Sequence, residues 1–390
     1  MNIKNKIVLS LLTASVVMMS TGCSNDDTTA AVVVPDVNYE VKQSADLLSS
    51  VNTGGANATG SRITGTPIAP ATKTTHTGHI TADATWDNNV THILSGLVIV
   101  DSGVTLTINP GTTVAGKAGT GTSTSYMVVN TGAKIIADGN ATDPIVFTSE
   151  TAVDGGTAAV GQWGGLTIIG NAANSQVAPY EVDTQFVAGT SNLADNSGSL
   201  TYVKILNSGI TMEQDKEING LSLVGVGSGT TITDITVDLS DDDCIEAWGG
   251  TVNMSNLTLT GCTDDFFDID DGYSGTVTNM VINNQGSGNS GIEMSGSTAA
   301  DFNNVYIGLG TNAIKDGGIF FKKDGIGGHF TDVTVENNAS NTSGAIYTQG
   351  TADIANISFT NVSLTGTSEY KITENETDSS GSAKAIFELF

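Results

Sequence analysis

Six short segments share one pattern in the second half of the chain: Asp234-Ile-Thr-Val, Asn256-Leu-Thr-Leu, Asn279-Met-Val-Ile, Asn304-Val-Tyr-Ile, Asp332-Val-Thr-Val and Asn356-Ile-Ser-Phe. Each begins with Asn or Asp and continues with strand-type alternation, and successive segments are 22, 23, 25, 28 and 24 residues apart. This period is typical of a β-solenoid, because one coil buries its apolar face only by stacking on copies of itself. We therefore predict an all-β solenoid of about 22–28 residues per coil.

The pattern of short β-branched runs extends toward the N-terminus, for example Leu97-Val-Ile-Val and Leu166-Thr-Ile-Ile. Gly, Asn and Asp separate these runs, and 47 glycines with six prolines suit tight corners rather than long helices. The segment 172–199 lacks strand character and is predicted to leave the solenoid as a long loop, a kind of segment that is commonly functional. The predicted parts are a signal peptide (1–22), a tether and N-terminal cap (23–78), the solenoid (79–365) and a C-terminal cap (366–390).

The first 22 residues read as a targeting segment. Lys4 and Lys6 precede an apolar run, Ile7–Met19, that is too short to span a bilayer, and Ser20-Thr-Gly-Cys23 follows. This resembles a bacterial lipoprotein signal, which implies that Cys23 becomes the lipidated first residue and anchors the chain in a membrane. Ser24 resembles outer-membrane sorting, so the expected location is the outer membrane, facing the periplasm or the cell surface. The alternative is an ordinary secretory signal with a free Cys nearby.

The charge balance limits the classes of partner. The chain has 41 acidic and 14 basic residues, for a formal net charge of -27. Nucleic-acid binding is excluded, because neutralising phosphates requires a basic surface. An acidic surface favours solubility, cation binding, or both. The four histidines have no partners at metal or triad spacing, and no nucleophile elbow accompanies the serines, so nucleophilic catalysis has no support.

The densest acidic signal lies in two neighbouring predicted coils, Ser240–Val252 and Thr263–Tyr273. A shift of 22 residues superposes their acids, and the next coil continues the row with Glu293. Apolar residues at the alternate positions should point inward, so period-2 alternation turns Glu246, Asp268 and Glu293 outward on one sheet face. Asp242, Asp264 and Asp270 share that parity. The pairs predicted by this register are Asp242 with Asp264, Asp243 with Asp265, Glu246 with Asp268, and Asp268 with Glu293.

Carboxylates stacked at coil spacing repel one another, so they must acquire raised pKa values, stay strongly hydrated or bind a cation. Oxygen ligands without His or Cys suit Ca2+, although the glycine-rich nonapeptide of Ca2+-binding β-rolls is absent. The alternative is a solvated acidic wall that keeps the sheet face soluble. Trp248, at the edge of this face, either stacks on a sugar ring or packs against a loop. The candidate Ca2+ ligands are Asp242, Asp264 and Asp268, and the candidate ligand-binding residues are Glu246, Asp268, Asp270, Glu293 and Trp248.

Cys244 and Cys262 remain after lipidation of Cys23. A disulfide is permitted in an oxidising compartment, but it requires a turn that brings the two Cα atoms within about 7 Å. The alternative is two buried free thiols.

Three motifs resemble known proteins. The repeats from about residue 95 to 365 resemble right-handed parallel β-helix proteins of the pectin-lyase-like superfamily. More narrowly, the chain is similar to secreted and lipid-anchored bacterial β-helix proteins. The motifs that carry this resemblance are Trp163-Gly-Gly-Leu-Thr-Ile-Ile-Gly-Asn-Ala, Asp242-Asp-Cys-Ile-Glu with Gly249-Gly-Thr-Val, and Asp264-Asp-Phe-Phe-Asp with Gly272-Tyr.

A competing resemblance is to polygalacturonase-type glycoside hydrolases, whose catalytic coils carry a segment like Asp242-Asp-Cys-Ile. It implies Asp242, Asp243, Asp264 and Asp265 as candidate catalytic acids, which inverting enzymes hold about 6.5–9.5 Å apart. The Gly-His-Gly and Arg-Ile-Lys elements of that family are missing. Arginine-based lyases are excluded from the repeats, because Arg62 is the single arginine and lies outside them. For a lyase base this leaves Lys322 and Lys323.

Three functions from different classes follow. The first is a cell-surface or periplasm-facing lipoprotein that binds an extracellular polysaccharide or a surface protein, with Ca2+ as the candidate cofactor. The second is a polysaccharide-degrading hydrolase or lyase that uses the stacked Asp residues. The third is a structural spacer without a ligand. The first is preferred, because a long acid-lined surface is present while a complete catalytic set is not.

Overall fold

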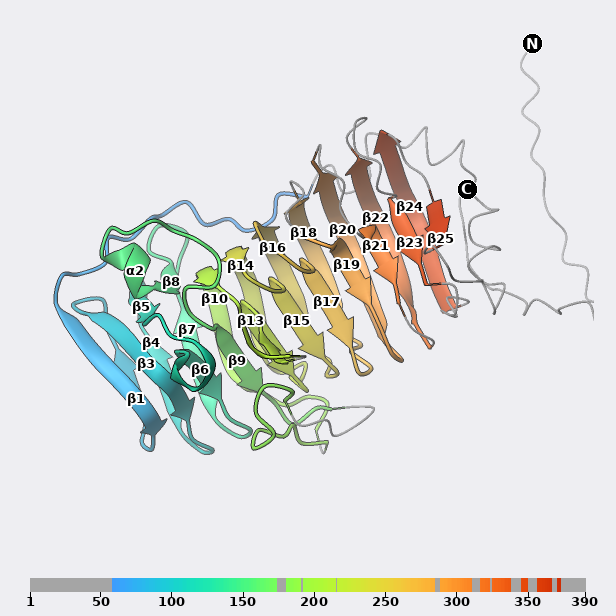
Figure 1. Cartoon of the computed structure of the whole chain (residues 1–390). Helices are drawn as coiled ribbons and strands as arrows, with labels where there is room; N and C mark the ends of the chain where they lie inside the picture. Colours follow the sequence, from blue (N-terminus) through green and yellow to red (C-terminus); the bar gives the residue numbers. More distant parts are fainter. Residues whose placement is uncertain are drawn as a thin grey trace, which may run out of the picture. The chain divides into compact units, whose positions relative to one another are not determined.

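The structure is a computed structural model that describes part of the chain. In the described part, parallel β-strands stack coil upon coil (Figure 1). The predicted signal peptide, Cys23 and almost all of the predicted C-terminal cap, 366–390, lie outside the described residues. Among those described, no helix is both long and apolar enough to cross a membrane. The described residues are 58–173, 180–190, 192–214, 216–284, 288–310, 316–322, 325–337, 345–349, 356–366 and 370–372.

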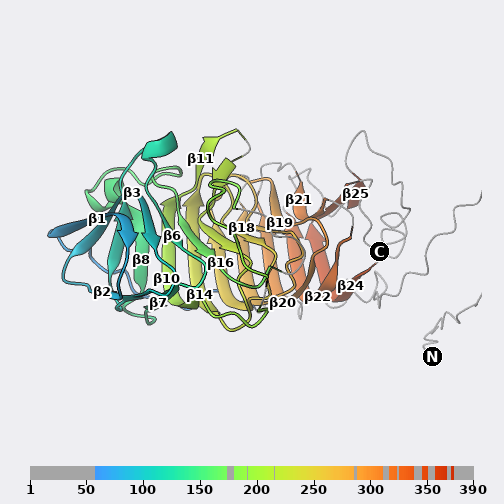
Figure 2. The same cartoon turned by 90° about the horizontal axis from the view of Figure 1, so that it is seen from below.

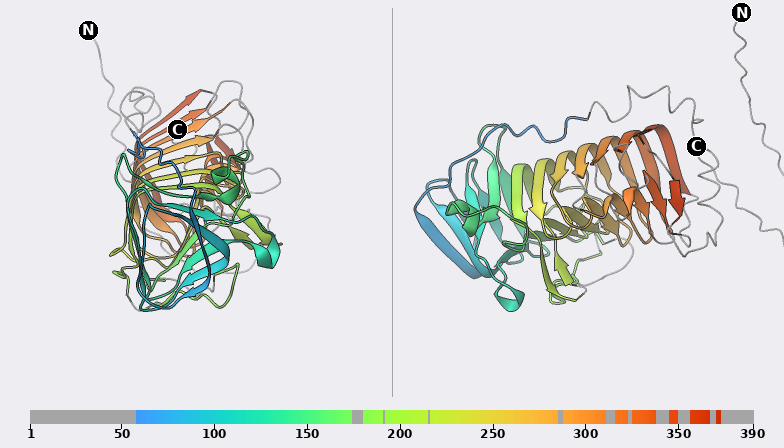
Figure 3. Two further views of the ribbon diagram at one scale, coloured as in Figure 1. Left: turned by 90° about the vertical axis from the view of Figure 1, so that its left-hand side faces the viewer. Right: turned by 45° about the horizontal axis from the view of Figure 1, so that its top comes forward.

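Each coil after residue 198 contains one long strand that bends at a corner and, between successive long strands, one short strand on a third face (Figure 3). Every long strand pairs in parallel with the long strand of the next coil. The long strands are β10 (Gly198–Ser208), β14 (Thr231–Ser240), β16 (Met254–Thr260), β18 (Thr276–Asn284), β20 (Ala299–Leu309), β22 (Gly327–Asn337) and β24 (Asn356–Gly366).

The short strands also pair in parallel and form what we call the short-strand sheet. It holds the residues on which the functional argument depends. Its strands are β6 (Tyr126–Val129), β9 (Leu166–Ile169), β13 (Leu221–Val224), β15 (Ile245–Trp248), β17 (Phe267–Asp270), β19 (Ser290–Met294), β21 (Gly317–Phe321), β23 (Ile346–Thr348) and β25 (Tyr370–Ile372).

The N-terminal coils use separate strands on each face. Two of these separate strands, β7 (Lys134–Asp138) and β8 (Ile145–Ser149), pair with the two halves of β10. The single bent strand β10 therefore continues both faces. Pairing starts at Lys73, six residues before the predicted start at residue 79, because β1 already pairs with β3. The remaining elements are β1 (Lys73–Ile80), β2 (Ala84–Trp86), β3 (Thr91–Val100), β4 (Thr105–Ile108), β5 (Thr113–Gly116), β7 (Lys134–Asp138), β8 (Ile145–Ser149), the antiparallel hairpin β11 (Ile210–Glu213) and β12 (Lys216–Ile218), a 3-10 turn (Gly121–Ser123) and α2 (Glu150–Val153).

From β14 onward, the corner of each long strand is held by the Asn and Asp column, whereas Tyr202 takes the corner position in β10. The residues of the column have φ of about 54° to 61°, a conformation that Asn and Asp tolerate better than other side chains. Their side chains also bond along the stack: Asn279 Nδ2 donates to Asn256 Oδ1 at 2.5 Å, and Asn304 Nδ2 to Asn279 Oδ1 at 3.3 Å. The predicted structural role of this column is confirmed for these coils.

The prediction that Asn356 is the sixth member of the column is wrong. Asn361, not Asn356, has the positive φ of 54° and donates through its side chain to Asp332. Asn356 lies opposite Gly327 at the start of β24. The last step is therefore 29 residues, one more than the predicted maximum. Both Asn residues precede a similar alternating segment, and the pairing of Phe359 with Phe330 selects the second.

Within the described part of the predicted tether and cap, residues 58–72 run along this corner, whereas 73–78 belong to β1 and pair with β3 (Figure 1). Thr59 N donates to Asn279 Oδ1 at 2.9 Å, and Ser61 N donates to Thr258 Oγ1 at 2.9 Å. Arg62 forms a two-point ion pair with the buried Asp234, at 2.8 Å for both Nε and the terminal nitrogen. Burial alone would raise the pKa of Asp234, but the bonds from Arg62 hold it below its ordinary value.

Apolar side chains fill the interior, and those one coil apart stack on each other. The rings of Phe302, Phe330 and Phe359 stack at centroid distances of 5.0 and 5.4 Å. Cys244 and Cys262 are buried and form a disulfide with a Cα–Cα distance of 5.6 Å, so the bridged alternative holds.

The segment predicted to leave the solenoid, 172–199, packs in part on the outer face of the short-strand sheet. Tyr180 and Phe186 are buried there against Ile169 and Val224, forming a second, smaller apolar cluster outside the solenoid interior. The hairpin β11–β12 projects from the stack beside this segment (Figure 2). These two additions turn part of an otherwise open sheet face into a walled groove.

Asn279→Ala should lower the free energy of unfolding by about 2–4 kcal/mol, because it loses hydrogen bonds in the corner ladder and replaces Asn, which tolerates the left-handed region, by Ala, which does so less well. Asn279→Gly loses the same bonds without the conformational strain and should be less destabilising by about 1 kcal/mol. Denaturant unfolding of both variants measures the difference. Equal losses would show that the backbone conformation of this corner contributes nothing.

Candidate functional site

A groove of about 420 Å³ lies on the outer face of the short-strand sheet. Most of its lining is acidic, and Lys322 supplies the one basic side chain among the lining residues. We call it the acidic groove. Its lining residues are Glu181, Thr211, Glu217, Asp242, Asp243, Glu246, Thr263, Asp264, Asp265, Asp268, Asn289 and Lys322.

The floor of the acidic groove contains Glu246 and Asp268, from a column of outward-facing acids that continues to Glu293, which is not among the lining residues. Glu246 on β15 pairs with Asp268 on β17, and Asp268 pairs with Glu293 on β19. Their neighbours Ile245 and Phe267 are fully buried in the interior, as the alternation requires. The register predicted from the shift of 22 residues is confirmed for this column.

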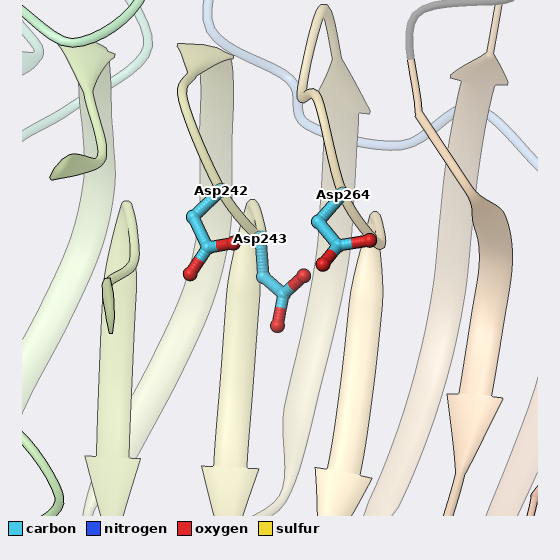
Figure 4. Close-up of side chains that lie close together, drawn as sticks. All are labelled: Asp242, Asp243 and Asp264. Carbon is cyan, nitrogen blue, oxygen red and sulfur yellow. The ribbon is translucent and has the colours of Figure 1, made fainter. Parts of the chain in front are cut away.

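The upper part of the groove comes from the turns that precede β15 and β17. There the aspartates bond to the backbone of the next coil: Asp265 N donates to Asp243 Oδ1 at 2.7 Å, and Ser290 N donates to Asp265 Oδ1 at 2.7 Å. Figure 4 shows the carboxylates of Asp242, Asp243 and Asp264 directed toward a common space. The coil-to-coil register therefore fixes the positions of these acids through the main chain.

Three overlapping groups of acids offer carboxylate oxygens that lie within 4.8 Å of one another. Ions or protons shared within such a group are expected, since ionised carboxylates at this distance repel strongly. The first triad is Asp242, Asp243 and Asp264, the second is Asp243, Glu246 and Asp268, and the third is Asp265, Asp268 and Glu293.

These acids do not form the solvated wall that the sequence left open. The exposed fractions are 6% for Asp243, 8% for Glu246, 5% for Asp265 and 3% for Glu293. Residues so buried contribute little to the hydration of a sheet face. Their burial is explained by the flanking loop and hairpin, which contribute Glu181 and other groove walls.

Burial and mutual repulsion favour the protonated form of the acidic side chains in the groove. Burial, followed by the neighbouring Asp264, raises the pKa of Asp242 to about 8. Burial and Glu217 raise the pKa of Glu181 to about 7. Burial first, and then nearby carboxylates, raise the pKa values of Asp243 and Asp268 well above the ordinary range. The same causes act on Glu246 and Asp265.

One buried acceptor in the groove has no hydrogen-bond donor among the described residues: Asp268 Oδ1. Other groove acids have donors, such as Asn219 Nδ2 on Glu246 Oε2 at 2.5 Å, and the side-chain amide of Asn289 on Asp264. A buried carboxylate oxygen without a donor is costly, and a bound cation satisfies it. The donor set, all oxygen and without a nearby free thiol or imidazole among the lining residues, suits a hard cation.

The predicted Ca2+ ligands Asp242, Asp264 and Asp268 do not form one triad. Asp242 and Asp264 share the first triad with Asp243, whereas Asp268 belongs to the other two. The 22-residue shift predicts which residues of neighbouring coils lie side by side. It does not predict which carboxylate oxygens point toward one another, because that depends on the side-chain directions at the turns.

Asp270 and Trp248 are not among the residues that line the groove. They pair with each other across β15 and β17, and Trp248 packs edge-to-face on Tyr180 with ring centroids 5.7 Å apart. Of the two roles open for Trp248, the structure therefore shows packing against a loop.

Lys322 lies in the groove, but not in the state that a lyase base requires. Its Nζ donates to Glu293 Oε1 at 2.6 Å. Burial alone would lower the pKa of Lys322, but Glu293, Asp268 and Asp265 raise it well above its ordinary value. The ammonium therefore stays protonated and cannot accept a proton from a substrate. Lys323 lies outside the described residues.

Glu181, Glu217 and Asn219 were missed by the sequence reasoning. Glu181 comes from the loop that leaves the solenoid, while Glu217 and Asn219 lie in and after the hairpin β11–β12. None of them belongs to the repeat, so no coil-to-coil shift could align them with the acidic column. The prediction that 172–199 leaves the solenoid was the one signal that pointed to this region.

The fold and the groove define a parallel β-helix protein with a walled, acidic groove on one sheet. The family model described as a pectate-lyase like beta helix domain matches residues 78–387, and the chain belongs to this family. The right-handed parallel β-helix implied by the sequence resemblance is thus confirmed. The family supports a carbohydrate-related role at most. No curated protein and no solved structure matches the chain.

Without divalent cations, stability should fall as the pH rises from about 4, where acids in the unfolded chain lose their protons, to about 8, the pKa of Asp242. In this window the folded protein binds more protons than the unfolded chain, so raising the pH favours unfolding. Melting temperatures in a chelator at pH 5 and pH 8 measure the effect. Asp242→Asn should flatten the slope, and a stability that rises through this window would contradict the buried-acid description.

Proposed function

We propose that the acidic groove binds a divalent cation, with Ca2+ as the best fit, and uses it to bind an extracellular polysaccharide. One observation supports the cation above all others: three triads of carboxylates lie with oxygens within 4.8 Å of one another in a single groove. Such spacing is unfavourable for free carboxylates and suited to ligands that share an ion.

The choice of Ca2+ rests on the chemistry of the donors. Ca2+ accepts about six to eight oxygen ligands in flexible geometry, whereas Mg2+ demands a near-ideal octahedron and keeps several waters. A triad supplies three of these oxygens, and side chains such as Asn219 and Asn289 lie close by. The remaining positions are left for water or for oxygens of a ligand.

Those remaining positions explain why a polysaccharide is the proposed partner. Hydroxyl and carboxylate oxygens of sugars are ligands of the kind that Ca2+ prefers. A groove so rich in acids repels a polyanion unless a cation lies between them. Binding of an acidic polysaccharide should therefore depend on the cation, while a surface protein or a neutral polysaccharide is the alternative partner.

Lipid attachment at Cys23 and an outer-membrane location complete the proposal. They rest on the sequence of residues 1–24, and the strand stack begins at Lys73, well after the predicted anchor.

A polysaccharide-degrading enzyme is the second candidate. It is favoured by Asp242, whose pKa of about 8 keeps a proton available for a leaving group near neutral pH. The spacing speaks against the inverting reaction, because oxygens of Asp242, Asp243 and Asp264 lie within 4.8 Å. That is closer to the about 5–5.5 Å of retaining glycosidases than to the about 6.5–9.5 Å that leaves room for water.

Replacing Asp264 and Asp268 together by Asn should weaken Ca2+ binding at least tenfold, since every triad loses one carboxylate. Calorimetric titration of the purified protein measures the affinity, and Asp301→Asn, which removes one carboxylate outside the groove, should leave it unchanged. Undiminished binding in the double variant would remove the acidic groove from the proposal.

Incubation with Ca2+ and a panel of acidic and neutral polysaccharides should separate binding from catalysis. Cation-dependent retention of acidic polysaccharides, without new reducing ends or unsaturated products, is the expected result. Products that disappear in Asp243→Asn or Asp265→Asn variants would instead establish the enzyme. Neither retention nor products across the panel would favour the spacer.

A further inference from the structure

Lys322 places a positive charge inside the acidic groove. It directly follows β21, and its backbone N–H donates to Met294 O at 2.9 Å, which fixes the residue beside β19. From there its Nζ reaches Glu293 Oε1 at 2.6 Å, and the carboxylate side chain is only 4% exposed. The ammonium is therefore built into the groove at the Glu293 end.

This end corresponds to the third triad, Asp265, Asp268 and Glu293. The electrostatic neighbours of Lys322 are these same three acids. The first triad, Asp242, Asp243 and Asp264, has no residue in common with the third, whereas the second shares Asp243 with one and Asp268 with the other. Two cations that do not share a carboxylate can therefore bind only at the first and third triads.

We propose that Lys322 is a resident cation that fills the third triad and limits the acidic groove to one divalent ion. The inference rests on the proposed function, since it assigns the divalent ion to the opposite end of the same groove. Two observations carry it: the ammonium already donates to Glu293 Oε1 at 2.6 Å, and Glu293 shares the third triad with Asp265 and Asp268. Removing the ammonium leaves three close carboxylates without a counter-charge.

The same geometry indicates what Lys322 does for a bound polysaccharide. A divalent ion at the first triad and an ammonium at the third are two positive centres at the two ends of one groove. A ligand with acidic groups on successive sugars can be held by charge at both ends, whereas a neutral chain gains only hydrogen bonds from Lys322. Lys322 is thus a specificity-determining residue for acidic ligands.

The test is the stoichiometry of Ca2+ binding by calorimetric titration of the purified protein and its variants. Wild type should bind one ion, Lys322→Met two, and Lys322→Arg one. Lys73→Met is the control, because Lys73 also forms carboxylate ion pairs, with Glu150 and Asp154, but outside the groove. It should retain a stoichiometry of one.

A second variant keeps the test sharp if Lys322→Met folds poorly. Lys322→Met with Glu293→Gln removes the charge and its buried partner together, and should again bind one ion. For the single variant, the melting temperature should drop in a chelator and recover with Ca2+ by a larger shift than wild type gains.

The two proposals fail in different ways. If wild type and Lys322→Met each bind one ion, and the variant shows no extra thermal recovery, the proposed role of Lys322 is overturned. The proposal that the groove binds a cation then still stands. No ion in wild type but one in Lys322→Met overturns the cation role of the native groove and supports Lys322 as its resident cation. No ion in any variant overturns both.

Discussion

The parallel register between coils is the constraint on which the rest of the structure depends. Each strand pairs with the strand one coil away, so a residue and its coil equivalent lie at the about 4.8 Å spacing of neighbouring strands. A favourable pair is then repeated along the stack, and so is an unfavourable one. Amides at the corner and phenyl rings in the interior gain from this repetition, as Asn256 and Asn279 or Phe302 and Phe330 show.

Acids lose from the same repetition, and the chain neutralises them in two different ways. At the corner, Asp234 starts the ladder and receives a two-point ion pair from Arg62, which comes from outside the repeats. In the short-strand sheet, Lys322 compensates only the Glu293 end of a much larger cluster. The remaining negative charge must be neutralised by protons or by a bound ion, because water does not hydrate these buried carboxylates.

The sequence predicts the fold and the acidic column well because both follow from repetition. The 22-residue shift contains no insertion between β15 and β17, so it places Glu246 on Asp268 correctly. Prediction fails where the repeat is ambiguous or interrupted. Asn356 and Asn361 precede similar segments, and only the stacking of Phe359 on Phe330 separates them. Glu181 and Glu217 enter the groove from a loop and a hairpin that no coil repeats.

The distribution of these irregular additions bears on why the acids are present. Solubility requires charges that stay in water, yet Glu246 and Glu293 are only 8% and 3% exposed. A spacer gains nothing from burying acids whose pKa values rise at the expense of stability near neutral pH. Tyr180 anchors the loop by packing on Trp248, and the adjoining Glu181 then adds one more acid to the groove. This loop adds a further acid to a cluster whose members already repel one another. Such an addition makes physical sense if a cation or a positively charged ligand group offsets the repulsion. This is the physical basis for proposing that the groove binds a ligand.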